Sequence, residues 1–398
     1  MANNNKHTGP NVPALRFPEF SGEWIESKLG DIADFSKGAG ISKDQRSEEG
    51  NPCILYGELY TRYKSEVITN VFSKTALPDS ELVKSKANDI IIPASGETAE
   101  DIATARCVPF DNILLGGDLN IIRLHEQDGK FFSYQLNGVR KYDIATVAQG
   151  VSVVHLHAGD LKGITVKYPS HIAEQEKISQ ILGLIDDRIA TQSKIIEELK
   201  TLRGALLEKV FQVSNPTLEV GAIAHQTSER NKLCRYSNVL SVSNRFGFIN
   251  QSEQFEDRNV ASDDVRNYKV VHRGDFAYNP ARINVGSIAM LKSFESGIVS
   301  PMYICFQVDD TIVDPSFFEL FLETKAFKDE MEIRLEGSVR RCLSFEALCE
   351  IHLPLPALLV QRSISNKIGN ISSKIKLEDR ILRAYIRQKE WLLKQMFI

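Results

Sequence analysis

The sequence predicts an α+β protein with two similar globular domains, each with a mixed or mainly antiparallel sheet, separated by two long helices that form an antiparallel coiled coil. Three observations predict this architecture. A heptad seam occupies residues 178–210, a second seam with the same spacing occupies residues 364–396, and matching segments precede both seams. The offset from Ile178 to Ile364, where the seams begin, equals the offset from Val210 to Met396, where they end.

Length and composition are those of a globular protein with more than one domain. The 398 residues exceed one ordinary core, and 42% hydrophobic with 25% charged residues is typical of soluble proteins. No stretch has the eighteen apolar residues of a membrane span, and residues 1–20 read as a polar tail. The six cysteines form no CxxC pair, so we expect no zinc or redox motif and a cytoplasmic location.

The two seams have alternating steps of four and three residues, which is the narrow stripe of a coiled coil. The apolar positions of the first seam are Ile178, Leu182, Ile185, Ile189, Ile196, Leu199, Leu206 and Val210. Those of the second are Ile364, Ile368, Ile371, Ile375, Leu382, Tyr385, Leu392 and Met396. Polar interruptions also match, because Gln192 aligns with Glu378 and Arg203 with Lys389. Each seam spans roughly 50 Å at 1.5 Å per residue, and the alternative is that each helix packs only on its neighbouring domain.

The repeat continues upstream of the helices. Gly150 and Pro169 align with Gly337 and Pro356 at one common offset, and Phe131-Phe132 matches Phe317-Phe318. We therefore expect a globular domain followed by a long helix, used twice. The expected boundaries are a tail at 1–20, domains at 21–169 and 213–356, and helices at 170–212 and 357–398.

Short apolar or alternating runs bounded by Gly, Pro or Asn predict strands inside the globular parts. In chain order they are residues 89–94, 113–124, 163–168, 286–291 and 300–308. Longer segments with aromatic residues at helical spacing, 131–142 and 317–333, predict helices. This mixture is the basis for the α+β class.

This order of motifs resembles one family, the specificity (S) subunits of type I restriction–modification enzymes. The resemblance covers nearly the whole chain. It is carried by LRFPEFSGEW (15–24) followed by KLGDIADFSKG (28–38), and by the helix starts AEQEKISQIL (173–182) and LVQRSISNKI (359–368) after the two closing prolines. The second copy has Gln361-Arg362 where the family more often has a Glu-Gln pair like Glu174-Gln175.

The resemblance implies two target-recognition domains, each reading one half of a bipartite, asymmetric site in double-stranded DNA. It implies that the helices act as a spacer and dock two methyltransferase (M) subunits, which associate with restriction/translocase (R) subunits. S-adenosylmethionine, ATP and magnesium are then expected in the partners, and no cofactor in this chain. The chain itself is expected to be a non-catalytic subunit.

Target-recognition domains read base edges with Arg, Lys, Asn and Gln and bind phosphates with basic groups. Polar loops therefore supply the DNA-binding candidates. In the first domain these are Lys37, Lys43, Arg46, Tyr63, Ser95, Arg106, Gln149 and His155. In the second they are Arg230, Asn231, Lys232, Arg245, Asn279, Arg282, Asn284, Arg340 and Arg341.

Catalytic and metal-binding patterns are weak. His155 and His157 share one face of a strand but have no third ligand nearby, so we expect no metal site. NPAR (279–282) lacks the second proline and the aromatic residue of amino-methyltransferase motifs. GAGISK (38–43) fails the spacing of a phosphate-binding loop. We therefore expect no catalytic residues, which disfavours a free-standing methyltransferase or nuclease.

The formal charge of −4 and pI of about 6.1 argue mildly against autonomous DNA binding. Partner subunits that close around the duplex would supply the missing positive charge, because DNA affinity depends mostly on phosphate neutralisation. The alternative function is a coiled-coil adaptor that joins other proteins without reading DNA.

Overall fold

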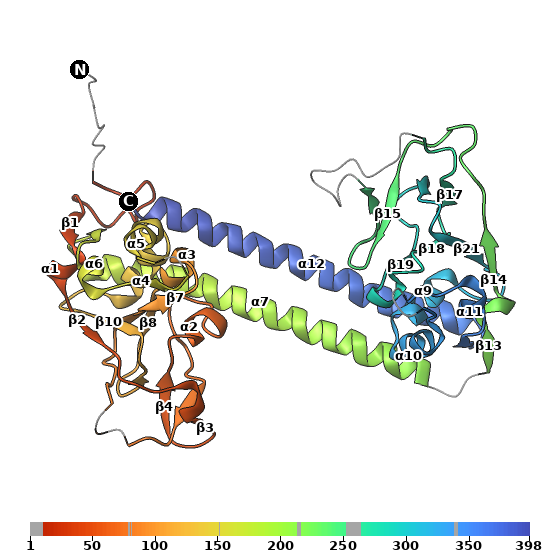
Figure 1. Ribbon diagram of the computed structural model, residues 1–398. Helices are drawn as coiled ribbons and strands as arrows, with labels where there is room; N and C mark the ends of the chain where they lie inside the picture. The colour runs from red at the N-terminus through yellow and green to blue at the C-terminus, as the bar shows by residue number, and fades with distance from the viewer. Residues whose placement is uncertain are drawn as a thin grey trace. The chain divides into compact units, whose positions relative to one another are not determined.

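Two long helices, α7 (Ile172–Gln212) and α12 (Leu358–Met396), each contribute residues to both units into which the chain folds (Figure 1). Unit 1 is Met1–Lys194 with Asp379–Ile398, and unit 2 is Ile195–Glu378. The computed structural model describes residues 11–78, 80, 82–150, 152–212, 216–251, 264–337 and 341–398. The predicted α+β class is confirmed.

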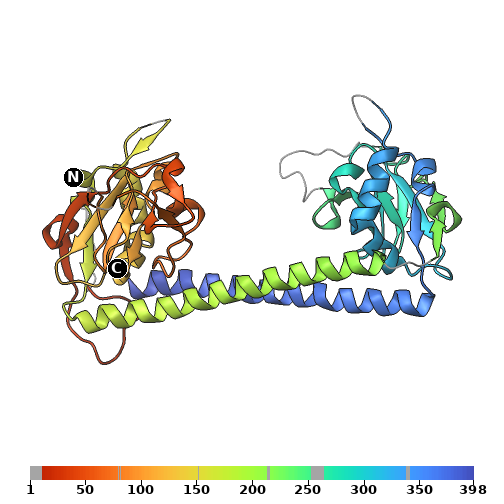
Figure 2. The same cartoon turned by 90° about the horizontal axis from the view of Figure 1, so that it is seen from below.

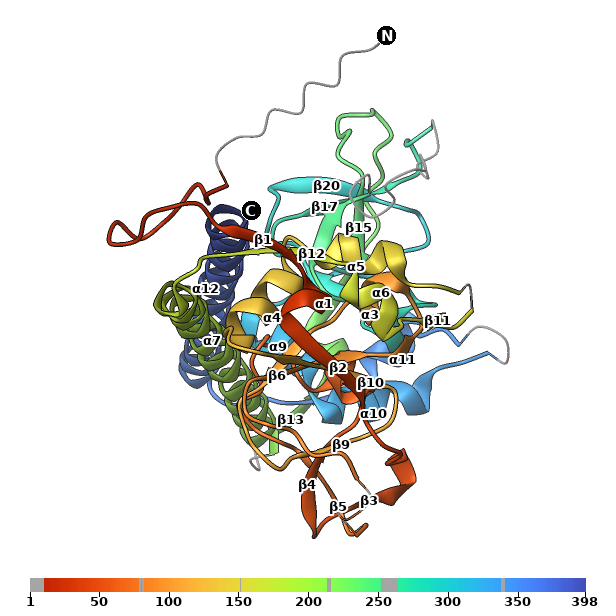
Figure 3. The same ribbon diagram turned by 90° about the vertical axis from the view of Figure 1, so that its left-hand side faces the viewer.

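Unit 1 is built on a four-stranded antiparallel sheet with the order β2-β10-β6-β8. Figure 3 labels three of these strands, β2, β10 and β6. These strands are β2 (Ala33–Lys37), β10 (Leu119–Leu124), β6 (Asp89–Pro93) and β8 (Arg106–Val108). A second, mixed sheet has the order β3-β5-β4-β9, with bounds Arg46–Ser47, Ser73–Thr75, Asn51–Ile54 and Leu114–Leu115. Two strand pairs complete the unit: β1 (Ile25–Lys28) with β12 (Thr165–Tyr168), and β7 (Ser95–Gly96) with β11 (Val154–His155).

Unit 2 repeats the same main sheet. Its order is β14-β21-β18-β19, again antiparallel throughout. The strands are β14 (Ala224–Thr227), β21 (Ile304–Val308), β18 (Phe276–Tyr278) and β19 (Ile288–Met290). Three strand pairs accompany it: β13 (Thr217–Glu219) with β22 (His352–Pro354), β15 (Leu240–Ser243) with β16 (Gly247–Asn250), and β17 (Lys269–His272) with β20 (Ser296–Val299).

Short helices surround the strands. In unit 1 they are α1 (Leu29–Ile32), η1 (Lys43–Gln45), α2 (Glu58–Thr61), α3 (Ala99–Ile102), α4 (Gly129–Asn137), α5 (Lys141–Val147) and α6 (Ala158–Lys162). In unit 2 they are η3 (Val220–Ala222), η4 (Ile283–Val285), α9 (Pro315–Glu323), α10 (Lys325–Arg334) and α11 (Phe345–Cys349). The paired phenylalanines of α4 and α9 are buried in the cores, because continuous apolar strands such as β6 need an apolar cover.

A buried polar clamp joins each long helix to its globular core. In unit 1, Asp128 caps α4, its carboxylate accepts a hydrogen bond from Ser179 Oγ at 2.7 Å, and its amide donates to Gln175 Oε1 at 3.0 Å. Gln175 Nε2 in turn donates to the carbonyl of Pro169 at 3.0 Å. The clamp therefore ties α4, the last turn before α7 and α7 itself to one another.

The clamp recurs in unit 2. Asp314 caps α9, accepts from Ser365 Oγ at 2.8 Å, and donates its amide to Gln361 Oε1 at 2.9 Å. Gln361 Nε2 donates to the carbonyl of Pro356 at 2.8 Å. Gln361 thus makes the same two clamp contacts as Gln175, and the glutamine of the helix start is present in both copies.

The two helix starts differ at Glu174 and Val360, one residue before the paired glutamines Gln175 and Gln361, and not at the glutamine itself. Glu174 is fully buried and accepts two hydrogen bonds from Arg16, each 2.8 Å long. Val360 holds the corresponding place in unit 2 and is 48% exposed. Arg16 belongs to the segment that we expected to be a polar tail, so part of that segment is bound to unit 1.

In each unit a stretch of α7 lies beside a stretch of α12 (Figures 1 and 2), and the two helices run in opposite directions. All but one of the predicted seam positions are buried or half-buried. The exception is Leu206, which is 37% exposed, whereas Leu207 is 4% exposed. The buried face shifts by one position here because Leu207 and Phe211 pack into the core of unit 2, where the Phe211 and Phe317 ring centroids are 4.8 Å apart.

The basic interruptions of the seams bond across the helix pair. In unit 1, Lys389 Nζ of α12 is 2.6 Å from Asp186 Oδ1 of α7 and also pairs with Glu66 at 2.5 Å. In unit 2, Arg203 of α7 donates to Ser372 Oγ of α12 at 2.7 Å and pairs with Glu323 at 2.8 Å. Lys389 and Arg203 hold equivalent positions, as do Asp186 and Ser372, so the polar interruptions serve as cross-helix anchors.

The anchor in unit 1 makes stability depend on pH. Burial raises the pKa of Glu66 above its usual 4.5; the Lys389 ammonium opposes this shift and Asp186 adds to it. Just above pH 4.5 the folded state therefore holds a proton that the unfolded state has released, so stability falls as pH rises through this window. We expect the Glu66→Gln variant to lose less stability than the wild type as pH rises from about 4.5 to about 7.

Urea unfolding followed by tryptophan fluorescence measures this effect, because both tryptophans, Trp24 and Trp391, lie in unit 1. Glu126→Gln, at an exposed position of the same unit, is the control and should follow the wild type. Parallel pH profiles for the wild type and Glu66→Gln would contradict the role assigned to Glu66.

Candidate nucleic-acid interface

Corresponding ends of the two main sheets carry most of the predicted residues. In unit 1, Lys37 ends β2 and pairs with Asn120 of β10, while Pro93 ends β6 and pairs with Leu119. In unit 2, β14 and β18 end where β21 begins, since Thr227 pairs with Cys305 and Tyr278 with Ile304. We call this end of each sheet its loop edge.

The loop edge of unit 1 brings Ser95, Gln149 and His155 together. His155 of β11 pairs with Ser95 of β7, and Gln149 forms a backbone bridge with His155. Leu156 N donates to the carbonyl of Ala94 at 3.0 Å, which fastens this turn to the end of β6. Gln149 and His155 are exposed and Ser95 is half-buried, so two of the three side chains face solvent.

Lys37 is also exposed at this edge, at the end of β2. Lys43 and Arg46 lie elsewhere, in η1 and β3, next to the second sheet. Lys43 is exposed, whereas Arg46 is half-buried and donates from Nε to the carbonyl of Lys43 at 3.1 Å. The structure therefore separates these two residues from the main loop edge.

Two predicted residues of unit 1, buried Tyr63 and half-buried Arg106, make their contacts within the unit. Tyr63 is 4% exposed in a core cluster, where burial raises the pKa of its hydroxyl to about 12. The Arg106 guanidinium donates to the carbonyl of Tyr63 at 3.0 Å and to that of Ala105 at 2.9 Å, and desolvation lowers its pKa. Both side chains brace the loop after α2 against β8.

The loop edge of unit 2 is formed around the 279–287 turn. Asn279 Oδ1 accepts from Ala281 N at 3.1 Å, and Gly286, with φ of +88°, ends η4 in a conformation that other residues adopt only with strain. Arg282 and Asn284 are exposed on this turn. The turn is fastened at both ends, so the exposed side chains stand on a fixed backbone.

Two neighbouring segments lie against this turn. Leu343 N donates to the carbonyl of Pro280 at 3.2 Å, and Ser287 Oγ donates to the carbonyl of Val242 at 3.0 Å. The first bond places the segment that contains Arg341 beside the turn. The second places the β15–β16 hairpin, which contains Arg245, beside it. Arg341 is already paired with Glu332, and Arg340 lies outside the described residues.

Residues 230–232 belong to the neighbouring strand pair. Asn231 is 3% exposed and exchanges two hydrogen bonds with the backbone of Tyr236, of 2.8 and 3.2 Å. This side chain holds its own loop closed. Arg230 is exposed and donates to the carbonyl of Asn267 at 2.9 Å. Lys232 is also exposed, and its backbone amide donates to the carbonyl of Arg230 at 2.8 Å.

The described residues hold neither a cluster of metal ligands nor a helix that could cross a membrane. Among these residues no three His, Cys, Asp or Glu side chains gather to hold a metal ion. None of the described helices is long and apolar enough to cross a bilayer.

Sequence reasoning missed the two capping aspartates of the clamps, Asp128 and Asp314. A signal was present, because each stands shortly before the matched phenylalanine pair, at the same position in both copies of the repeat. An Asp before an aromatic helix start is a typical N-cap pattern. The contacts of these carboxylates with the long helices could not be read from that pattern.

Comparisons with known proteins agree with this arrangement. Residues 21–201 match the family model of the type I restriction modification DNA specificity domain. The chain is 23% identical over 401 residues to the type I restriction enzyme MjaVIII specificity subunit of Methanocaldococcus jannaschii, covering 92% of this chain and 89% of that protein.

Two solved structures share the fold. The S subunit of a type I restriction–modification system from M. genitalium has a TM-score of 0.64 at 18% identity, covering 97% of this chain and 99% of that one. A chain from a study of complex assembly and conformational transition of the type I R-M system has a TM-score of 0.54 at 14% identity, covering 94% of this chain and 97% of that one.

The duplicated sheets and matched long helices thus accompany a match to a DNA specificity domain over residues 21–201. Over nearly its whole length the chain is similar to a specificity subunit of a type I restriction enzyme.

The exposed arginine of the 279–287 turn gives a direct test of the loop edge of unit 2. We expect Arg282→Ala to weaken binding of the target DNA by about 5- to 150-fold, the range for losing one bidentate base contact. Arg341→Ala should have a smaller effect, because Arg341 is held by Glu332. Fluorescence anisotropy with labelled duplexes measures both.

Arg273→Ala provides the matched control. Arg273 is exposed and paired with Glu295, and it precedes β18 at the end of the strand opposite Tyr278. Equal losses of affinity from Arg282→Ala and Arg273→Ala would show that the loop edge is not the DNA-binding surface.

Proposed function

We propose that each unit reads one half of a bipartite, asymmetric site in double-stranded DNA, and that α7 and α12 set the spacing between the half-sites. The observation that carries this proposal is the identical strand order of the two main sheets with different loops at the same edge. Two sheets with the same strand order but different loops would present different side chains to the two half-sites. The functional division would follow residues 21–169 and 213–356 as recognition domains, 170–212 and 357–398 as spacers, and 1–20 as an N-terminal tail.

Loop residues that remain exposed support direct contact with DNA. They are Lys37, Gln149 and His155 in unit 1, and Arg245, Arg282 and Asn284 in unit 2. Each can donate hydrogen bonds to base edges or phosphates, and half-buried Ser95 and Asn279 lie beside them. Lys43, Arg230 and Lys232, exposed away from the two main turns, would contact the phosphate backbone.

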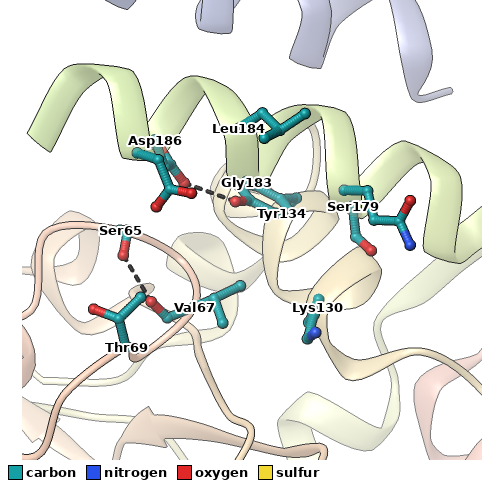
Figure 4. A pocket seen from close by; sticks show the side chains of 11 residues that line it. Ser65, Val67, Thr69, Lys130, Tyr134, Ser179, Gly183, Leu184 and Asp186 are labelled. Carbon is teal, nitrogen blue, oxygen red and sulfur yellow. Dashed lines mark hydrogen bonds between the residues drawn. The ribbon is translucent and has the colours of Figure 1, made fainter. Parts of the chain in front are cut away.

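The long helices would also dock two methyltransferase subunits, which in turn would recruit the restriction/translocase subunits. A cavity of about 390 Å³ in unit 1 lies beside α7 and is lined by residues of α4, α7 and the 65–69 loop (Figure 4). Next to it Leu184 is 61% exposed, and on α12 Trp391 is 54% exposed. Exposed large apolar side chains of this kind mark protein-binding surfaces when they occur together with a concave site.

The chemistry would reside in the partners. S-adenosylmethionine, ATP and magnesium would be bound by the methyltransferase and translocase subunits, and the assembly would act in the cytoplasm. The six cysteines are free thiols, in keeping with a reducing compartment. Since this chain has a net charge of −4, partner subunits would supply most of the phosphate neutralisation.

Modified-base sequencing of the host genome tests the function. With the gene intact we expect a split, asymmetric methylated motif, which disappears when the gene is deleted. Exchanging residues 213–356 for the corresponding domain of another specificity subunit should change one half of the motif and leave the other half and the spacer intact. A motif that survives deletion, or changes in both halves after the exchange, would refute the proposal and favour the adaptor function.

The docking surface is tested by Leu184→Asp. We expect this variant to bind the methyltransferase subunits about tenfold more weakly, or worse, in size-exclusion or titration assays, because a charge replaces an apolar contact. Lys194→Asp, which also places a carboxylate at an exposed position of α7 in unit 1, is the control. Normal assembly by Leu184→Asp would place the docking site elsewhere on the chain.

A further inference from the structure

The tip of the β15–β16 hairpin in unit 2 is a short, fixed turn. Ser243 pairs with Gly247, so only Asn244, Arg245 and Phe246 form the loop. Ser243 Oγ accepts hydrogen bonds from the amides of Arg245 at 3.2 Å and Phe246 at 3.4 Å. Gly247 has φ of +66°, the left-handed conformation that closes three-residue hairpin loops. The loop backbone is therefore held in one conformation.

This turn presents an aromatic ring to solvent. Phe246 is 68% exposed, and the Arg245 guanidinium carbon lies 5.2 Å from the centre of its ring. A tight turn is normally occupied by small or polar residues. A phenylalanine there contributes little to the core of unit 2, and its apolar surface becomes favourable only when a partner covers it.

The hairpin tip lies at the loop edge of unit 2. Ser287 Oγ bonds the carbonyl of Val242 at 3.0 Å, and Gly286 approaches Asn244 so closely that a Cβ at Gly286 would be 3.4 Å from the Asn244 Cβ. Phe246 is therefore next to the turn that carries Arg282. A ligand bound along this edge would meet the ring together with the polar side chains.

The chemistry around the ring indicates which partner it meets. Neither Arg245 nor Arg282 forms an ion pair with a residue in the described ranges. Val285 and Met302 are exposed by 52% and 62% at the same edge. Two guanidinium groups with no described carboxylate partner, beside exposed apolar side chains, fit an anionic ligand with an apolar interior. A DNA groove with stacked bases has this character.

We propose that Phe246 is an apolar wedge that enters between two adjacent base pairs of the half-site bound by unit 2 and partially unstacks them. Arg245, already positioned over the ring, holds the adjacent phosphate. Wedges of Phe or Leu next to basic residues bend DNA in this way, and the unstacking is offset by the added contact. The inference rests on the proposed reading of DNA by this unit and adds readout of base-step deformability to it.

The wedge belongs to one unit. Between β2 and β6, unit 1 has the β3, β4 and β5 strands of its second sheet, whereas between β14 and β18, unit 2 has β15–β16 and strand β17. The distortion is therefore expected in the half-site of unit 2. Flexible pyrimidine–purine steps would be favoured at the contacted position, because they unstack most easily.

The test uses the full chain with its methyltransferase partners and duplexes that contain the methylated motif. 2-Aminopurine replaces adenine at successive positions of the half-site assigned to unit 2 by the domain exchange. We expect fluorescence to increase on binding at one step for the wild type and not for Phe246→Ala. The variant should bind about tenfold more weakly, within the range for losing one base–aromatic contact, and Phe246→Leu should keep part of the fluorescence change.

Ile312→Ala is the matched control. Ile312 is a 39% exposed apolar residue of the same unit, and it follows β21 at the end opposite the loop edge. It should bind and unstack DNA like the wild type. Thermal unfolding of all variants should match the wild type, because Phe246 is not part of a core cluster.

Three results would overturn the wedge. The first is wild-type affinity of Phe246→Ala. The second is no fluorescence increase at any step for the wild type. The third is that wild-type protein loses as much affinity when thymine in the half-site is replaced by uracil as it loses through Phe246→Ala. That result would assign Phe246 to a contact with the thymine methyl group in the major groove. A wild-type complex that methylates no split motif would instead refute the proposed function itself.

Discussion

The clamp between each long helix and its globular core is the interaction on which the rest of the structure depends. Its polar groups are buried or half-buried. A donor or acceptor left without a partner there would destabilise the fold by its full desolvation free energy. Asp128 and Asp314 each serve two purposes, capping a short helix and binding a serine of the long helix. The core can therefore attach to its long helix in one register only.

This constraint explains why the two copies agree in some segments and differ in others. The clamp needs an Asp, a Gln and a Ser at set positions, and the seams need apolar residues at heptad spacing. The loop edges have no comparable requirement, because their polar side chains can be hydrated. Two cores with different loops can thus share one frame, and this is the property that a protein reading two different half-sites requires.

The architecture could be predicted from the sequence because the long helices and the repeat produce periodic patterns of residues. The heptad seams, their constant offset along the chain and the paired phenylalanines all survive in a single chain. Residue-level roles at the loops are harder to predict, because a polar residue in a loop can either face a ligand or brace the loop. Asn231 and Arg106 were singled out by residue type, yet both bond backbone carbonyls beneath the surface. The register at the end of α7 was also missed, since heptad spacing says nothing of the core that captures Leu207.

Two arginines without a described carboxylate partner bear on how a chain of acidic composition would read DNA. Many arginines and lysines are engaged: Arg203, Arg273, Arg341 and Lys389 each pair with a carboxylate. Arg245 and Arg282 pair with no described carboxylate, and both lie at the loop edge of unit 2. A few such groups can discriminate bases but release few counterions, so they contribute specificity more than affinity. If the chain reads DNA as proposed, strong binding must come from partner subunits that surround the duplex.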